Sequence, residues 1–266
     1  MALFPRSALA VLCTLGIAQA ASLTAYLSPP GQMQSVIPGV VTETFDELPL
    51  LTLINSAGFA SPIGTYVGNT SRIGVIAADQ YGGAGNSDYM YVGSRQGGDS
   101  TSVTLTLNTP ADYFGFWWSA GDAANRISVY SKGVLVAQFS TSDITSLLAN
   151  NPLIALNGTT YQTSAYYGNP NTGQFSGQDN AEPFAYVNLV ASGFTFDKLV
   201  LDNATNSGFE NDNNSVFSGT VNIPQDFPSF VKVVDVPFST VPEPGYPMLL
   251  GLLFVGSAYW KMRRAA

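Results

Sequence analysis

The stretch RISVYSKGVLVAQF at residues 126–139 gives the clearest indication of the fold. Apolar and polar side chains alternate on both sides of Ser131-Lys132-Gly133, which is the pattern of two short strands joined by a tight hairpin turn. Similar runs, separated by Gly, Asn, Asp or Pro, recur along the chain. We expect further strands at 72–77, 89–92, 102–107, 113–118, 184–189, 194–201, 216–221 and 230–236. Ten or so short strands with turn signals between them predict an all-β fold, a jelly-roll-like β-sandwich.

One short helix is expected among these strands, at residues 141–149. Ser140 precedes it and Asp143 follows three residues later, as in a capping box. The apolar positions of this segment share one helical face, so we expect the helix to cover one edge or end of the sandwich. These positions are Ile144, Leu147 and Leu148.

Composition supports one globular β domain between an apolar N-terminal segment and an apolar C-terminal segment. Of the 266 residues, 45% are apolar and only 11% are charged, so the chain can bury a core. The formal net charge is -8, and the few basic residues of the middle are dispersed. Because no basic patch tracks a phosphate backbone, we expect no nucleic-acid partner.

The residue inventory excludes several kinds of catalytic site. The sequence has no histidine, and its one cysteine, Cys13, lies in the N-terminal segment. This removes Ser-His-Asp and Cys-His machinery and the usual zinc and iron sites. A polysaccharide-modifying hydrolase needs two carboxylates about 5–10 Å apart, which a sequence does not locate. It remains as an alternative, and we expect a protein without enzymatic activity.

A signal peptide is predicted at residues 1–20. A positive charge at Arg6 precedes a short apolar stretch at 8–17, and small residues precede the bond between Ala20 and Ala21. This is the order that signal peptidase recognises, so we expect cleavage at that bond. A retained membrane anchor is the alternative, although the apolar stretch is short for a membrane span.

Residues 241–266 combine three features. A Pro-Glu-Pro triplet precedes an uncharged stretch at 245–260, and basic residues cluster at 261–264. As a helix the uncharged stretch would rise about 24 Å, slightly less than a ~30 Å hydrocarbon core. The basic cluster would stay cytoplasmic. We therefore predict a single transmembrane helix that leaves the body outside. A permanent C-terminal anchor and a buried terminal helix are the alternatives.

This three-part tail resembles the PEP-CTERM sorting signal of Gram-negative bacteria. The resemblance implies processing by an exosortase, a membrane cysteine protease-transpeptidase, after transient anchoring in the inner membrane. It also implies a host that makes extracellular polysaccharide. The chain then divides into a signal peptide at 1–20, a β-sandwich domain at 21–240 and a sorting signal at 241–266. The residues that the exosortase would read, as a substrate, are Val241, Pro242, Glu243 and Pro244.

Five short motifs lie in a fixed order along the body. They are FDELP at 45–49, YGGAG at 81–85, FGFWWSAGD at 114–122, YGNP at 167–170 and GFENDN at 208–213. This order resembles a group of exosortase-dependent surface proteins, which is defined by export and sorting and not by a known activity. In that group a histidine usually follows the last motif. Here the residue is Asn214, so any role of that histidine does not carry over.

The aromatic run YFGFWW at 113–118 is expected to form a strand with rings on both faces. One interpretation is that both faces pack, one into the core and the other under a loop. Another is a sugar platform, because a flat ring stacks on the C–H face of a pyranose. The Gly- and Asn-rich stretch at 161–182 predicts a long exposed loop with further tyrosines. The candidate ligand-binding residues are Trp117, Tyr161, Tyr166 and Tyr167.

Acidic residues form the second candidate set. Asp46 lies near the start of the body, and Glu210 and Asp212 lie near its end. The first and last strands of many jelly rolls are neighbours, so we expect these carboxylates to meet. Carboxylates are hard oxygen donors that suit calcium, although the spacing is not that of an EF-hand loop. Solvated turn residues are the alternative interpretation.

Taken together, the sequence predicts an exported cell-surface or extracellular-matrix protein. We expect it to be processed by exosortase, associated with exopolysaccharide and non-enzymatic. The alternative function is a calcium-stabilised carbohydrate-binding module.

Overall fold

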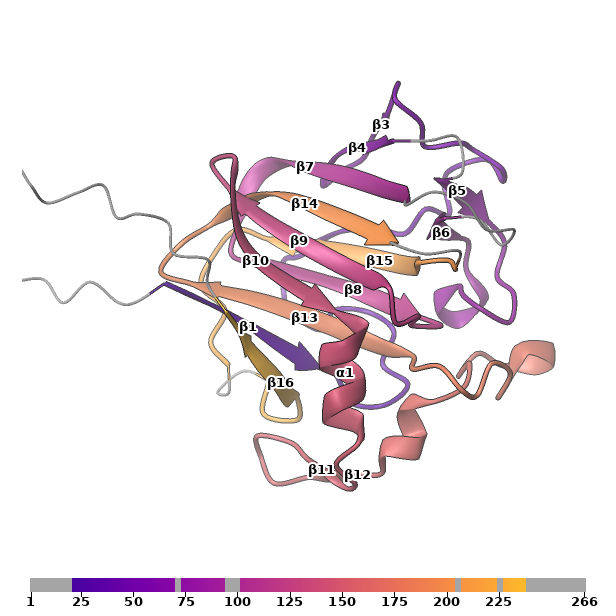
Figure 1. Ribbon diagram of the computed structural model, residues 1–266, viewed down its shortest axis with the longest axis vertical. Coiled ribbons are helices and arrows are strands. Elements are labelled where there is room, and N and C mark those ends of the chain that lie inside the picture. The colour runs from indigo at the N-terminus through magenta and orange to yellow at the C-terminus, as the bar shows by residue number, and fades with distance from the viewer. Residues whose placement is uncertain (1–20, 70–72, 94–100, 204–206, 224–226, 238–266) are drawn as a thin grey trace, which may run out of the picture.

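The computed structural model describes residues 21–69, 73–93, 101–203, 207–223 and 227–237. Within them the chain folds into antiparallel sheets, two of which pack face to face, and one short helix lies at their side (Figure 1). The predicted all-β sandwich with a single short helix is confirmed at this level.

The larger sheet contains eight strands. Their bounds are β1 Ser22–Leu27, β2 Val41–Glu43, β5 Ile73–Ile76, β6 Tyr89–Val92, β8 Tyr113–Ser119, β13 Ala185–Ser192, β15 Glu210–Phe217 and β16 Val231–Val236. The spatial order is β16, β1, β13, β8, β15, β6, β5, and β2 also pairs with β15. The first and last strands in sequence, β1 and β16, are therefore neighbours, although no strand was expected at β1 and the first expected strand, β5, lies at the other edge of the sheet.

The smaller sheet contains six strands in the spatial order β10, β9, β14, β7, β4, β3. Their bounds are β3 Phe59–Ala60, β4 Gly64–Gly68, β7 Thr101–Ala111, β9 Asn125–Ser131, β10 Val134–Ser140 and β14 Phe196–Asn203. A separate ribbon pairs β11 Leu153–Ile154 with β12 Thr160–Tyr161. Three 3-10 turns lie in the loops: η1 Ala84–Asn86, η2 Thr163–Tyr166 and η3 Gly173–Phe175.

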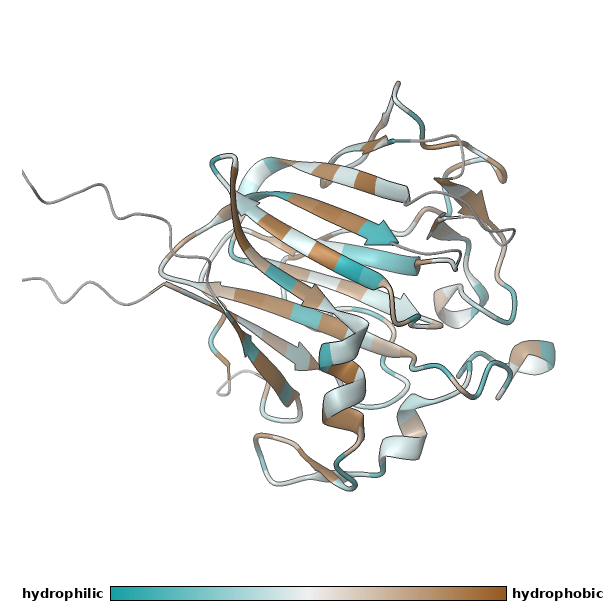
Figure 2. Ribbon diagram, viewed as in Figure 1, coloured by the Kyte–Doolittle hydropathy of each residue, from teal (hydrophilic) through white to brown (hydrophobic). Residues whose placement is uncertain are grey.

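The core lies between the two sheets because every second side chain of a strand points to the same face. In β7, Val103, Leu105 and Leu107 point into the core, while the threonines between them do not. Figure 2 shows this alternation of apolar and polar positions along the strands. We call the face of the larger sheet that points away from this core the outer face.

The hairpin predicted at Ser131-Lys132-Gly133 is confirmed between β9 and β10. Lys132 and Gly133 both have positive φ, 51° and 80°, as a two-residue type I′ turn requires. The Lys132 amide donates to the Asp197 carboxylate at 2.9 Å, which holds the turn against the start of β14.

The predicted helix is confirmed as α1, Thr141–Leu148. The capping box is present, since the Ser140 amide donates to the Asp143 carboxylate at 2.8 Å. Ile144 and Leu148 are buried. The helix contacts β10 and β16, which are edge strands of the two sheets, so it closes one open side of the sandwich (Figure 1).

Strand β15 corrects the sequence-based expectation. A strand was expected at 216–221, whereas β15 covers Glu210–Phe217 and so includes the acidic, Asn-rich run. The interpretation of Glu210 and Asp212 as solvated turn residues is therefore wrong, since both are buried. Asp and Asn are poor strand formers, but pairing with β8, β6 and β2 on both sides overrides that local preference.

The chain enters and leaves the sandwich at the same place. Leu23 of β1 is the register partner of Val236 of β16, so the two ends of the described body lie side by side (Figure 1). Among the described residues, none of the helices is long and apolar enough to cross a bilayer. The predicted signal peptide at 1–20 and the sorting segment at 241–266 lie outside the described residues.

Candidate functional site

The aromatic run of β8 packs on both of its faces. Phe114, Phe116 and Trp118 lie in the core between the sheets. On the outer face, Trp117 packs in a second cluster with Phe184 and Tyr186. The interpretation that both faces pack, one into the core and the other under loops, is confirmed.

A glycine makes this close packing on the outer face sterically feasible. A Cβ atom on Gly115 would lie 2.1 Å from the Tyr113 hydroxyl and 2.7 Å from the Tyr186 hydroxyl. These hydroxyls are part of a buried polar network, in which Tyr113 donates to the Asn188 side chain at 2.9 Å. Burial raises the pKa of Tyr113 above its usual value, so the hydroxyl stays protonated as a donor at physiological pH.

Asp212 holds the glycine-rich loop at residues 80–88 onto the outer face. It is the register partner of Trp117, and its side chain is fully buried. Its Oδ2 accepts from the Ala84 amide at 2.9 Å and from the Ser87 hydroxyl at 2.6 Å, while Oδ1 accepts from the Asn213 amide. Burial raises the pKa of this carboxyl from 3.8 to about 7, against the opposing effect of these hydrogen bonds.

The loop between β12 and β13 keeps many exposed residues, as predicted for 161–182, but buried side chains dock it onto the body. Asn169 is buried and donates to the carbonyl oxygen of Asp79 at 3.0 Å. Asn171 is also buried, and its amide donates to the carbonyl oxygen of Gly83 while its side-chain oxygen accepts from the Gly85 amide. Amide side chains thus join two long loops over the larger sheet.

A pocket of about 210 Å³ lies next to these docked loops. Three turns build it: Asp122 follows β8, Glu182 ends the long loop, and Ser207 and Gly208 precede β15. We call it the acid pocket, because Asp122, Glu182 and the buried Glu210 all line it.

The carboxyls of the acid pocket bind protons more tightly than usual. Burial, hydrogen bonding to Asp179 and the charge of Asp122 raise the pKa of Glu182 from 4.5 to about 8. Burial raises the pKa of Asp122, with Ser207 donating to it in opposition. Burial, and then the charge of Asp122, raise the pKa of Glu210 well above its usual value. A hydrogen bond between two carboxyl groups requires a proton on one of them, so the pocket retains protons near neutral pH.

The predicted calcium ligands do not form one site. Asp46 accepts the Asp88 amide at 2.9 Å, Asp212 binds the glycine-rich loop, and Glu210 lines the acid pocket. The Asp46 charge contributes to the raised pKa of Asp212. Among the described residues there is no group of three or more His, Cys, Asp or Glu side chains that would hold a metal ion.

The four candidate aromatic residues differ in exposure. Trp117 and Tyr166 are each only 1% exposed, so neither offers a ring face to a ligand, and the expectation of an exposed Tyr166 is wrong. The Tyr166 hydroxyl donates to the Ser28 carbonyl oxygen at 2.9 Å. Tyr161 and Tyr167 are half-buried and pack against the core. The structure thus brings Trp117 next to the acidic residues of β15, but as part of a packed layer.

Sequence reasoning missed Glu182 and gave Asp122 no role of its own. Both follow or precede a strand at the same end of the larger sheet, Asp122 after β8 and Glu182 before β13. Because β8 and β13 are antiparallel neighbours, the end of β8 lies beside the start of β13. The proximity of Asp122 and Glu182 would therefore follow from the sequence if the strand pairing were known. The pairing itself depends on contacts distant in sequence.

No protein-family model and no curated protein matches this chain. A solved structure that matches is the catalytic domain of a GH87 alpha-1,3-glucanase in complex with tetrasaccharides. The identity is 14% and the TM-score is 0.29, and the match covers 77% of this chain and 30% of that chain.

Proposed function

We propose that the protein is an exported cell-surface or extracellular-matrix protein that an exosortase processes at its C-terminal end. The observation that supports this is the three-part tail: the Pro-Glu-Pro triplet, the uncharged stretch at 245–260 and the basic cluster after it. The predicted signal peptide at 1–20 also supports export across the inner membrane. On this proposal the tail crosses the inner membrane only until it is cleaved.

The arrangement of the body is compatible with tethering by the tail. Strand β1 begins at Ser22, next to the predicted cleavage bond, and Val236 of β16 is its neighbour. A tether at this end would leave the docked loops and the acid pocket at the other end of β8. The sandwich would then present those loops away from the membrane before release.

We also propose that the body is non-enzymatic and associates with extracellular polysaccharide. The sequence has no histidine, and the buried acidic side chains bind loops and one another. These contacts give the carboxyls a structural role. Association with polysaccharide is inferred from the resemblance of the tail, and it takes a more specific form in the next subsection.

Substitution of the triplet tests the proposed processing. A Pro242→Ala, Pro244→Ala double variant, expressed in the natural host, should accumulate as an uncleaved membrane-bound form. A Pro237→Ala variant, altered outside the triplet, should be cleaved like the wild type. Fractionation and immunoblotting with an antibody to the body distinguish the two. Equal cleavage of both variants would refute a sorting role for the triplet.

A further inference from the structure

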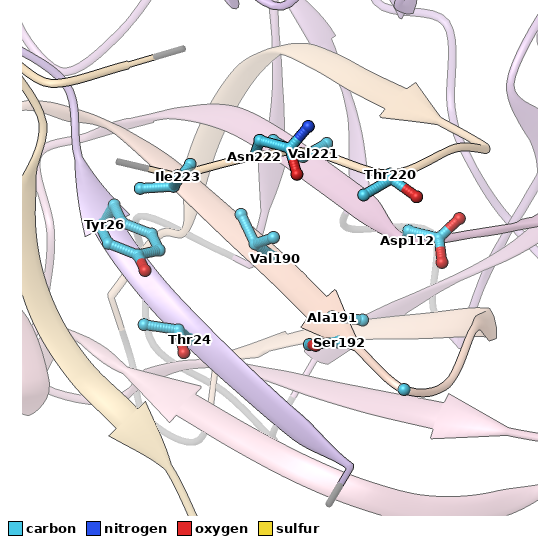
Figure 3. Close-up of a pocket in the computed structure, with 11 residues that line it drawn as sticks. Thr24, Tyr26, Asp112, Val190, Ala191, Ser192, Thr220, Val221, Asn222 and Ile223 are labelled. Carbon is cyan, nitrogen blue, oxygen red and sulfur yellow. The ribbon is translucent and has the colours of Figure 1, made fainter. Parts of the chain in front are cut away.

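A second concave surface lies on the outer face, remote from the acid pocket. It is a groove of about 410 Å³ over the neighbouring strands β1 and β13, and the segment Thr220–Ile223 forms one wall (Figure 3). Thr24 and Val190, which are register partners, form part of its floor. Asp112 closes the end near the β7–β8 turn, whereas the acid pocket lies beyond the opposite end of β8.

The groove combines one aromatic ring with hydrogen-bonding groups. Tyr26 is half-buried and lies beside Ile223 at one end (Figure 3). Asp112 and Thr220 lie at the other end, and Asn222 lies on the wall between the two ends of the groove. An aromatic wall with a few polar groups is the usual composition of a small-molecule site, and about 300–1,000 Å³ is the usual size.

The Asp112 carboxylate of the groove is held in place before any ligand arrives. The Asp112 backbone pairs with Phe217 on one side and Ala191 on the other, at 3.0 and 2.7 Å. Its Oδ2 accepts from the Gly219 amide at 2.9 Å, and its Oδ1 has no hydrogen-bond partner among the described residues. Asn222 is exposed, so its amide is available to a ligand. A carboxylate already ordered in this way loses less conformational entropy when a ligand binds.

The lining excludes several classes of ligand. The described lining contains no lysine or arginine, and Lys232, the register partner of Tyr26, is paired with Asp235 at 2.7 Å. An anionic ligand would therefore meet Asp112 without a compensating positive charge. A purely apolar ligand would bury the polar groups without hydrogen bonds, which is costly. One carboxylate is too few for a calcium site.

We propose that this groove binds an uncharged saccharide, with a sugar ring stacked on Tyr26 and its hydroxyl groups bonded to Asp112 and Asn222. Sugar hydroxyls both donate and accept, so they match a carboxylate oxygen and an amide at once. This deepens the proposed association with polysaccharide and rests on that part of the proposed function. It does not depend on the cleavage of the tail.

Calorimetric titration of the full chain, purified in a detergent without a sugar headgroup, tests the site. The probes are neutral gluco-, galacto- and manno-oligosaccharides, with glucosamine and glucuronic acid oligomers as cationic and anionic probes. At least one neutral series should bind, and the glucuronic acid oligomers should not. Tyr26→Ala should weaken binding about tenfold, and Tyr26→Phe should retain most of it.

Asn222→Ala serves as the variant that leaves the fold intact, since this side chain is exposed. It should weaken binding about fivefold, the effect of one lost hydrogen bond. Asn180→Ala, an exposed change on the long loop, is the matched control and should bind like the wild type. The proposal is overturned if no neutral probe binds, if only the glucosamine oligomers bind, or if Asn222→Ala binds normally. Any of these results leaves the tail-cleavage assay unaffected, so the two proposals fail separately.

Discussion

Asp212→Asn should change the pH dependence of stability, because it replaces a buried carboxyl with a group that does not titrate. Burial raises the folded-state pKa of Asp212 from 3.8 to about 7. Between these pH values the folded chain keeps a proton that the unfolded chain has lost, so wild-type stability falls as the pH rises. At about 1.4 kcal/mol for each tenfold change in proton affinity, the loss is about 4 kcal/mol between about pH 4 and pH 8.

The variant should therefore be less stable than the wild type at low pH and more stable at high pH. In the wild type both carboxyl oxygens accept from backbone amides, whereas in the variant the side-chain NH2 group would face one of these donors. At pH 4.5 the variant should therefore be less stable by about 1 kcal/mol. At pH 8 it should be more stable, by about 3 kcal/mol, because the wild type then carries a buried charge. No histidine titrates in this range, since the sequence has none. A change of stability near neutrality thus reports on the carboxyls with raised pKa.

Urea denaturation at pH 4.5, 6 and 8, followed by tryptophan fluorescence, measures these differences. Asp235→Asn is the control, because hydrogen bonding to Lys232 lowers the pKa of the exposed Asp235. The stability that Asp235 contributes is present above its unfolded pKa and is lost only as the pH falls through its folded pKa. Between pH 6 and 8 the free energy of unfolding of Asp235→Asn should therefore change with pH in parallel with that of the wild type. Parallel curves for Asp212→Asn as well would refute the reasoning.

Three further predictions concern packing and metal binding. Trp118→Ala should lower the free energy of unfolding by about 3–5 kcal/mol in urea, since the indole is buried and stacked on Phe209 at 4.8 Å. Gly115→Ala should destabilise on the order of 2 kcal/mol in the same assay, because its Cβ would clash with the Tyr113 and Tyr186 hydroxyls. Calcium or EDTA should leave the melting temperature unchanged, because the described residues hold no group of metal ligands, and a calcium-dependent rise would contradict this.

Several strands were predicted close to their observed bounds. The strand expected at 89–92 matches β6, and the hairpin at residues 126–139 matches β9 and β10 within a residue or so. Strand β4, Gly64–Gly68, was missed because glycine at both ends hides the pattern. These glycines are required by close packing, since a Cβ on Gly64 would lie 2.2 Å from the Thr106 carbonyl oxygen.

The candidate sites were harder to predict than the strands. The sequence singles out Glu210 and Asp212 as acidic residues, but not their burial, which comes from pairing with strands more than 90 residues away in sequence. No local sequence pattern marks Tyr26 or Asp112 as a binding residue. They line one groove only because β1 pairs with β13 and the chain after β15 passes over that pair.

The most direct test of the account is the mass of the C-terminal peptide of the extracellular protein from its natural host. Export followed by sorting predicts a product that begins at Ala21 and ends close to the Pro-Glu-Pro triplet, without the apolar stretch at 245–260. A secreted product that still carries Arg264 would contradict that account.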